Sequence, residues 1–156
     1  MSNYVFVLDK NKKPLDPTHP AKARKLLKEG RARVFKRYPF TILIHYLEKD
    51  QCTTYSHQLK LDPGSKTTGM AILQGNRVLW GAELNHRASQ IRDALLSRRQ
   101  LRRGRRSRKT RYRKPRFLNR TRPEGWLPPS LMSRIHNIET WIQRLRKVCP
   151  ITGLAK

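Results

Sequence analysis

One aspartate and a dense run of arginines are the residues of this 156-residue chain with the clearest chemical potential. Asp62 ends the alternating segment 58–62 and directly precedes Pro63 and Gly64, so it can present its carboxylate where a strand enters a turn. Mg²⁺ takes one or two protein carboxylates together with water and substrate phosphate. Asp62 is therefore a candidate magnesium ligand, and the competing interpretation is that it only caps the turn.

The segment after Asp62 is similar to a nucleotide-binding loop but lacks its spacing. That loop needs Gly-x-x-x-x-Gly-Lys, whereas Ser65 separates Gly64 from Lys66, and Leu59 stands where the first glycine would be. We therefore do not predict a nucleotide site. Lys66 is instead a candidate for contact with a nucleic-acid backbone phosphate, or it faces solvent.

Residues 87–122 carry arginine or lysine at almost every second position against one acidic residue, Asp93. Arginine outnumbers lysine there, which favours bidentate phosphate contacts over diffuse positive charge. We predict binding to structured RNA or an RNA–DNA duplex, whose backbone can be recognised without base contacts; an unstructured polyanion-binding tail is the alternative. The candidate binding residues in this run are Arg92, Arg98, Arg99, Arg102, Arg103, Arg105, Arg106, Arg108, Lys109, Arg111 and Arg113.

The overall charge supports a polyanionic partner. The formal net charge is +26 and the pI is about 11.4, which favours nucleic acid. A membrane partner is disfavoured because apolar residues are scattered through the basic run and no apolar run approaches the ~20 residues that span a bilayer. The N-terminus becomes charged too soon for a signal peptide, so we expect a cytoplasmic protein.

The two cysteines, Cys52 and Cys149, predict neither a disulfide framework nor a zinc site, because no paired C-x-x-C is present. A metal site that combines Cys52 with His45 or His57 is kept as a weaker alternative. A buried or surface thiol is the simpler interpretation of both residues.

The pattern of apolar residues and turn formers predicts an α/β protein that starts with a small basic β-α-β-β unit in residues 1–48. Residues 9–14 are rich in turn formers, and residues 20–30 start with proline and stop at glycine, as a short helix does. The expected strands of this unit are residues 4–8, 31–35 and 40–46.

A second set of elements is expected after a polar connection. Residues 57–86 should form an antiparallel meander, because short glycine-containing turns join its three strand-like runs. Residues 87–122 should hold a long basic helix with cations on all sides, and residues 123–156 a proline-rich loop, a helix packed on the meander and an incomplete strand. The strand-like runs are residues 58–62, 68–74 and 78–84. The predicted apolar face of the packing helix comprises Ile135, Ile138, Trp141, Ile142, Leu145 and Val148.

The order of these parts resembles the N-terminal portion of IscB-type RNA-guided DNA endonucleases. Residues 59–84, with Leu-Asp-Pro-Gly followed by Thr-Gly-Met-Ala, resemble the first segment of the RuvC nuclease domain, and residues 88–122 resemble the arginine-rich bridge helix. Residues 5–46 are similar to the family's small N-terminal domain of the Pro-Leu-Met-Pro or RRXRR type, although Asp16 replaces the methionine. Residues 125–130 resemble the stretch that re-enters RuvC.

The resemblance implies an RNase H-like sheet in which Asp62 is the first catalytic, metal-binding carboxylate, with Mg²⁺ as cofactor of the complete nuclease. It implies guide RNA and target DNA as partners, with the basic helix on the guide RNA and the RNA–DNA duplex. In the family, the next catalytic glutamate, the HNH domain and the last RuvC segment follow the point where this sequence ends, and Glu83 has no counterpart among the ligands. We therefore expect a truncated front portion that binds but does not cut alone, with a second polypeptide as one source of the rest.

The competing function is a stand-alone, non-catalytic RNA-binding protein, either ribosome-associated or a regulator of transposon RNA. Its basic run would be the same. The two hypotheses differ in Asp62, since a protein that only binds RNA should tolerate the loss of this carboxylate.

Overall fold

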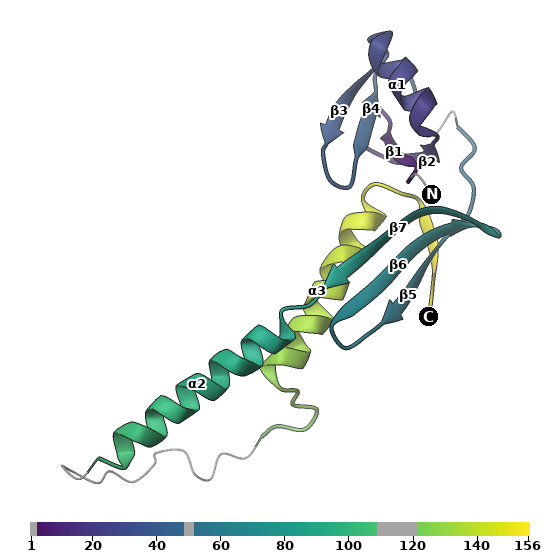
Figure 1. Cartoon of the computed structure of the whole chain (residues 1–156). Coiled ribbons are helices and arrows are strands. Elements are labelled where there is room, and N and C mark those ends of the chain that lie inside the picture. The colour runs from purple at the N-terminus through teal and green to yellow at the C-terminus, as the bar shows by residue number, and fades with distance from the viewer. Residues whose placement is uncertain (1–2, 49–51, 109–121) are drawn as a thin grey trace. The chain divides into compact units, whose positions relative to one another are not determined.

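The computed structural model describes residues 3–48, 52–108 and 122–156. Within these residues the chain forms two four-stranded mixed sheets and three helices, which confirms the α/β class (Figure 1). Met1–Asn85 together with Ile138–Lys156 form one compact unit, and His86–Asn137 form a second.

The first sheet has the strand order β2-β1-β4-β3, with β1 and β4 parallel and the other pairs antiparallel. Helix α1 starts at a proline and is capped by the His19 ring, whose Nδ1 accepts the backbone N–H of Ala21 at 3.2 Å. It buries Ala23 and Leu26 in one apolar cluster with residues of β1, β2 and β4. The elements are β1 (Val5–Leu8), β2 (Pro14–Thr18), α1 (Pro20–Lys28), β3 (Ala32–Lys36) and β4 (Thr41–Ile44).

This N-terminal unit has one strand more than the β-α-β-β order expected from the sequence. The additional strand, β2, contains Pro14 and Pro17, which have no N–H group to donate to a neighbouring strand. It lies at the edge of the sheet and pairs only with β1, and an edge is where a strand tolerates proline. The observed order is therefore β-β-α-β-β.

The second sheet has the order β7-β6-β5-β8. Its first three strands form the predicted antiparallel meander, and β8 runs parallel to β5. The C-terminal half of α3 packs on this sheet, where Leu145 is fully buried among Leu59, Ile72 and Trp80. Ile135 was expected on the packed face, but it is exposed. The elements are β5 (His57–Pro63), β6 (Thr67–Gln74), β7 (Arg77–Asn85), α3 (Pro129–Arg146) and β8 (Ile151–Ala155).

The two sheets are joined within the first unit by the residues that precede β1. The side chain of Asn3 accepts the N–H of Gly81 and donates to its carbonyl oxygen, both at 3.1 Å, and the N–H of Tyr4 donates to Leu79 O at 2.8 Å. Phe6 of β1 is fully buried in the core of the second sheet, with its ring 5.8 Å from that of Trp80. The start of the chain therefore fixes β1 against β7.

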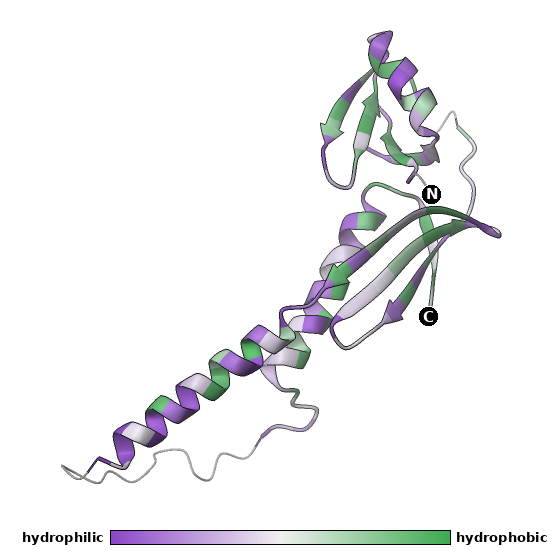
Figure 2. Cartoon of the chain, in the orientation of Figure 1, coloured by the Kyte–Doolittle hydropathy of each residue, from purple (hydrophilic) through white to green (hydrophobic). Residues whose placement is uncertain are grey.

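The second unit contains α2 (Ala88–Arg106), a helix of 19 residues with no buried residue. Gly104 does not interrupt it; the helix ends at Ser107, whose hydroxyl donates to Arg103 O at 3.2 Å. Figure 2 shows α2 as mostly hydrophilic with separate hydrophobic positions. Among the described residues, no helix has the length and apolar character to cross a membrane.

Candidate nucleic-acid interface

The arginines of α2 gather on one side of the helix. At about 100° per residue, the positions of its seven arginines fall within an arc of about 160°. This differs from the expectation of cations on all sides. The arginines are Arg92, Arg98, Arg99, Arg102, Arg103, Arg105 and Arg106. The remaining arc carries Ser89, Gln90, Asp93, Ala94, Leu96, Ser97, Gln100, Leu101 and Gly104.

Most of the positive charge on this arginine face is not neutralised within the described residues. Arg92 forms the one ion pair found there, with Asp93 at 3.0 Å, and Arg102 Nε donates to the carbonyl oxygen of Arg98 at 3.2 Å. All seven side chains are exposed. The face therefore presents guanidinium groups that can still donate to phosphate oxygens.

Of the other predicted binding residues, Arg108 is exposed just after α2, whereas Lys109, Arg111 and Arg113 lie outside the described residues.

Two further contacts of basic residues are found in this unit. Arg122 lies over the ring of Trp126, 4.0 Å from the ring centroid. Burial, and then the charge of Arg134, lower the pKa of His86.

Asp62 is exposed near the end of β5, next to the turn that leads into β6. Gly64 makes this turn possible, because a Cβ at position 64 would lie 2.3 Å from the carbonyl oxygen of Thr67. Lys66 is exposed in the same turn. A short, glycine-dependent hairpin thus holds the predicted carboxylate at the end of a strand.

The register of the second sheet adds a second carboxylate to the same face. Asp62 is paired with Gly69 of β6, and Gly69 is paired on its other side with Glu83 of β7. Directly paired residues of neighbouring strands point to the same face, so Asp62 and Glu83 share a face, with a residue that has no side chain between them. Strand spacing puts their backbones about 10 Å apart. Across the described ranges, no group of three or more His, Cys, Asp and Glu residues is placed to hold a metal ion.

Asp16 connects β2 to the segment before β5. Its two carboxylate oxygens accept the N–H of Tyr55 at 3.1 and 3.2 Å, and Oδ1 lies 3.9 Å from Nδ1 of the buried His57. This role was not predicted from the sequence, because the partner is 39 residues away and comes from a segment with no regular pattern.

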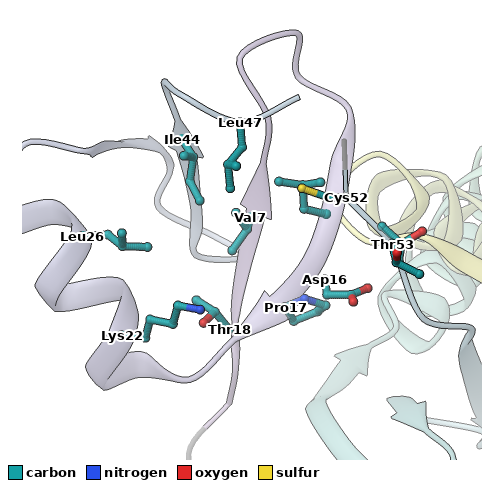
Figure 3. Close-up of a pocket in the computed structure, with 12 residues that line it drawn as sticks. Val7, Asp16, Pro17, Thr18, Lys22, Leu26, Ile44, Leu47, Cys52 and Thr53 are labelled. Carbon is teal, nitrogen blue, oxygen red and sulfur yellow. The ribbon is translucent and has the colours of Figure 1, made fainter. Parts of the chain in front are cut away.

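Asp16 also lines a pocket of ≈ 240 Å³ in the first unit. Its apolar wall includes Val7, Ile44 and Leu47, and Figure 3 shows Lys22 and Asp16 on opposite sides of it.

The two cysteines lie in different places. Cys52 lines this pocket, and Cys149 is fully buried in the core of the second sheet. Burial, and then the charge of Asp16, raise the pKa of the Cys149 thiol to about 12, so this thiol is unreactive at neutral pH.

Comparison with protein families gives a match over nearly the whole chain. The model of the family described as RRXRR protein matches residues 5–155. A comparison with curated proteins found no match.

Proposed function

This chain belongs to the RRXRR protein family, and we propose that it binds guide RNA and an RNA–DNA duplex as part of an IscB-type RNA-guided DNA endonuclease. The observation that supports this most is the one-sided arginine face of α2, a helix without a single buried residue. The family match supports the resemblance seen in the sequence, in which this helix corresponds to the bridge helix.

The arginine face has the chemistry to hold a nucleic-acid backbone. A helix of 19 residues is about 28 Å long, which spans several successive phosphates. Arginine donates two parallel hydrogen bonds to one phosphate, and each contact releases condensed counterions. Because such contacts go to the backbone, they recognise the geometry of a duplex and not its base sequence.

In this proposed nuclease, Asp62 is a ligand of Mg²⁺. One exposed carboxylate at a rigid strand end fits this ion, which takes one or two carboxylates and completes its shell with water and phosphate. When bound, Mg²⁺ would supply Lewis-acid stabilisation of the charge on the scissile phosphate. In the described part of the chain Asp62 shares this face with Glu83, and no third His, Cys, Asp or Glu is placed with them to hold a metal ion, so the proposal takes further ligands from another segment or polypeptide.

The test of the RNA-binding part compares the chain with a variant in which Arg99, Arg102, Arg103 and Arg106 are all alanine. The variant should bind structured RNA and an RNA–DNA duplex more weakly, with a salt dependence that is flatter by up to ~0.9 per lost duplex contact. The matched control replaces Ser89, Gln90, Ser97 and Gln100 by alanine on the arginine-free side. Equal salt slopes for both variants would place the RNA site elsewhere.

The test of the nuclease part measures DNA cleavage with Mg²⁺. The chain alone should not cut, and adding the later RuvC and HNH segments of an IscB-type nuclease should give cleavage that depends on Asp62. Cleavage by the chain alone that is lost in Asp62→Ala would contradict the need for further ligands.

A stand-alone RNA-binding protein is the second candidate function. It is favoured by the finding that no three His, Cys, Asp or Glu residues of the described part of the chain are grouped to hold a metal ion, because RNA binding requires no such group. This candidate predicts that Asp62→Ala changes no activity of the chain under any condition, including in the presence of the added nuclease segments.

A further inference from the structure

The first unit contains an aromatic cleft that shares no residue with the arginine face of α2. It encloses ≈ 410 Å³, within the range of about 300–1,000 Å³ that is typical of ligand sites. Four aromatic rings and two arginines line it, and they come from the segment before β1, from α1, from the β3–β4 turn and from β7. These residues are Tyr4, Tyr38, Phe40, Trp80, Arg24 and Arg37.

The aromatic rings form a floor and an exposed wall. Trp80 is buried at the floor, while Tyr38 is 62% exposed and Phe40 39% exposed. The ring of Tyr38 is supported on one side by Trp141 of α3, with the two rings 5.8 Å apart and nearly perpendicular. Large exposed aromatic side chains that are held in place can stack with a flat ligand at little conformational cost.

The charge around the cleft is positive. Arg24 and Arg37 line it and are exposed, and no Asp or Glu is among the residues that line it within the described part of the chain. Arg77 lies over the ring of Tyr4 at 4.9 Å, and Arg144 over the ring of Trp141 at 5.2 Å. A fitting ligand therefore carries negative charge beside a flat ring.

Unpaired nucleotides have this combination of features. Single-stranded nucleic acid is held where bases stack on aromatic side chains while a positive groove follows the backbone. A proline-rich peptide also fits a groove lined with aromatic side chains, but it offers no charge for Arg24 and Arg37. We propose that the aromatic cleft binds one or more unpaired nucleotides of RNA, stacked on Tyr38 and Phe40 with phosphate at Arg24 and Arg37. This inference rests on the proposed function only in taking RNA as the polyanion.

The experiment uses the full chain and an unstructured oligouridylate that carries one 2-aminopurine. Stacking quenches this base, so binding and stacking are read from one titration. Tyr38→Leu and Phe40→Leu should each weaken binding by about fivefold or more and reduce the quenching, because stacking on an aromatic ring contributes about 1–3 kcal/mol per base. Tyr38→Phe should behave like the unmodified chain, because it keeps the ring.

The matched control is Tyr55→Leu. Tyr55 is 65% exposed, as open as Tyr38, but it does not line the cleft, and its contact with Asp16 uses the backbone N–H. This variant should leave affinity and quenching unchanged. Thermal unfolding of every variant checks that the fold is retained.

The α2 variant with four alanines separates this inference from the proposed function. Loss of duplex binding in that variant, with quenching at the cleft still sensitive to Tyr38, supports both. If the four-alanine variant still binds the duplex and the quenching still depends on Tyr38, the assignment of α2 as the duplex-binding site is contradicted and the assignment of the cleft is supported. If Tyr38→Leu and Phe40→Leu keep the affinity and quenching of the unmodified chain, the cleft is not the nucleotide site. The proposal would also be overturned if a proline-rich peptide binds the cleft in preference to the oligouridylate.

Discussion

Asp62 and Glu83 flank Gly69 from the two strands on either side of it, on one face of the second sheet. Both carboxylates are exposed. The missing side chain at position 69 leaves the surface between them open. The two acids therefore make a matched pair, and substitutions at each can be compared directly.

We expect Asp62→Asn to abolish DNA cleavage by the chain supplemented with the later nuclease segments, and Glu83→Gln to retain it. Both variants should bind RNA normally and unfold within about 0.5 kcal/mol of the unmodified chain, because they change exposed side chains. Cleavage and RNA affinity measured on the same preparations make the comparison. Equal loss of cleavage in Glu83→Gln would show that the metal site extends along the row.

Replacing Arg99, Arg102, Arg103 and Arg106 by lysine should weaken duplex binding while leaving its salt dependence unchanged. Lysine keeps the charge and therefore the counterion release, but it loses the two parallel hydrogen bonds to phosphate. Titrations at several salt concentrations measure both quantities. If the lysine variant binds as tightly as the arginine form, bidentate contacts are not part of the interface.

Gly64→Ala and Gly104→Ala should have opposite effects. A Cβ at position 64 would lie 2.3 Å from Thr67 O, so the hairpin beside Asp62 must shift, and we expect a loss of more than about 1 kcal/mol in the free energy of unfolding. At position 104 no atom lies within 4 Å of the added Cβ, and alanine in a helix interior gains about 0.5–1 kcal/mol over glycine. Circular dichroism should show more helix for Gly104→Ala and a lower melting temperature for Gly64→Ala.

Asp16→Ala should destabilise the first unit by about 0.5–1.5 kcal/mol, because the N–H of Tyr55 loses its acceptor. Asp16→Asn should cost less, since one side-chain oxygen still accepts. Urea unfolding of the two variants measures the difference. If Asp16→Met, which has no oxygen to accept the N–H of Tyr55, is as stable as the unmodified chain, these hydrogen bonds contribute nothing.

Cys149 should resist alkylation at pH 8 in the folded protein and react after unfolding, whereas Cys52 should react in the folded state. Cys149 is fully buried and its thiol has a pKa of about 12, compared with 9.0 for the free group.

Between pH 9 and pH 12 the Cys149 thiol loses its proton in the unfolded state but keeps it in the folded state. The free energy of unfolding should therefore fall as pH rises from 9 toward 12. Cys149→Ala should remove this part of the pH dependence. Labelling followed by mass spectrometry, and unfolding curves across this range, provide the readouts.

The regular elements were predictable because their local signals agree with the fold. Helix α1 has proline at its start and glycine after its end, and the meander strands are joined by short glycine turns. The strand β2 was missed because its two prolines argue against a strand unless the strand is known to lie at an edge, and sequence alone does not reveal an edge.

Individual residues of the candidate site could be selected from the sequence, but their arrangement in space could not. Asp62 stood out through its place before a glycine turn, whereas its relation to Glu83 depends on a register that is set by pairing and interrupted by a bulge after Ile72. The aromatic cleft was missed for a similar reason. Tyr4, Tyr38 and Trp80 come from three separate segments, and only the tertiary fold brings them together.

The parallel pairing of β5 with β8 joins His57 to Ile151, so neighbouring strands of one sheet are separated by most of the chain. The second unit lies entirely within that separation, as one continuous stretch that leaves the first unit after Asn85 and returns at Ile138. The arginine face of α2 lies in this stretch, whereas every strand of both sheets lies in the first unit. Surface substitutions on that face therefore leave every strand register unchanged.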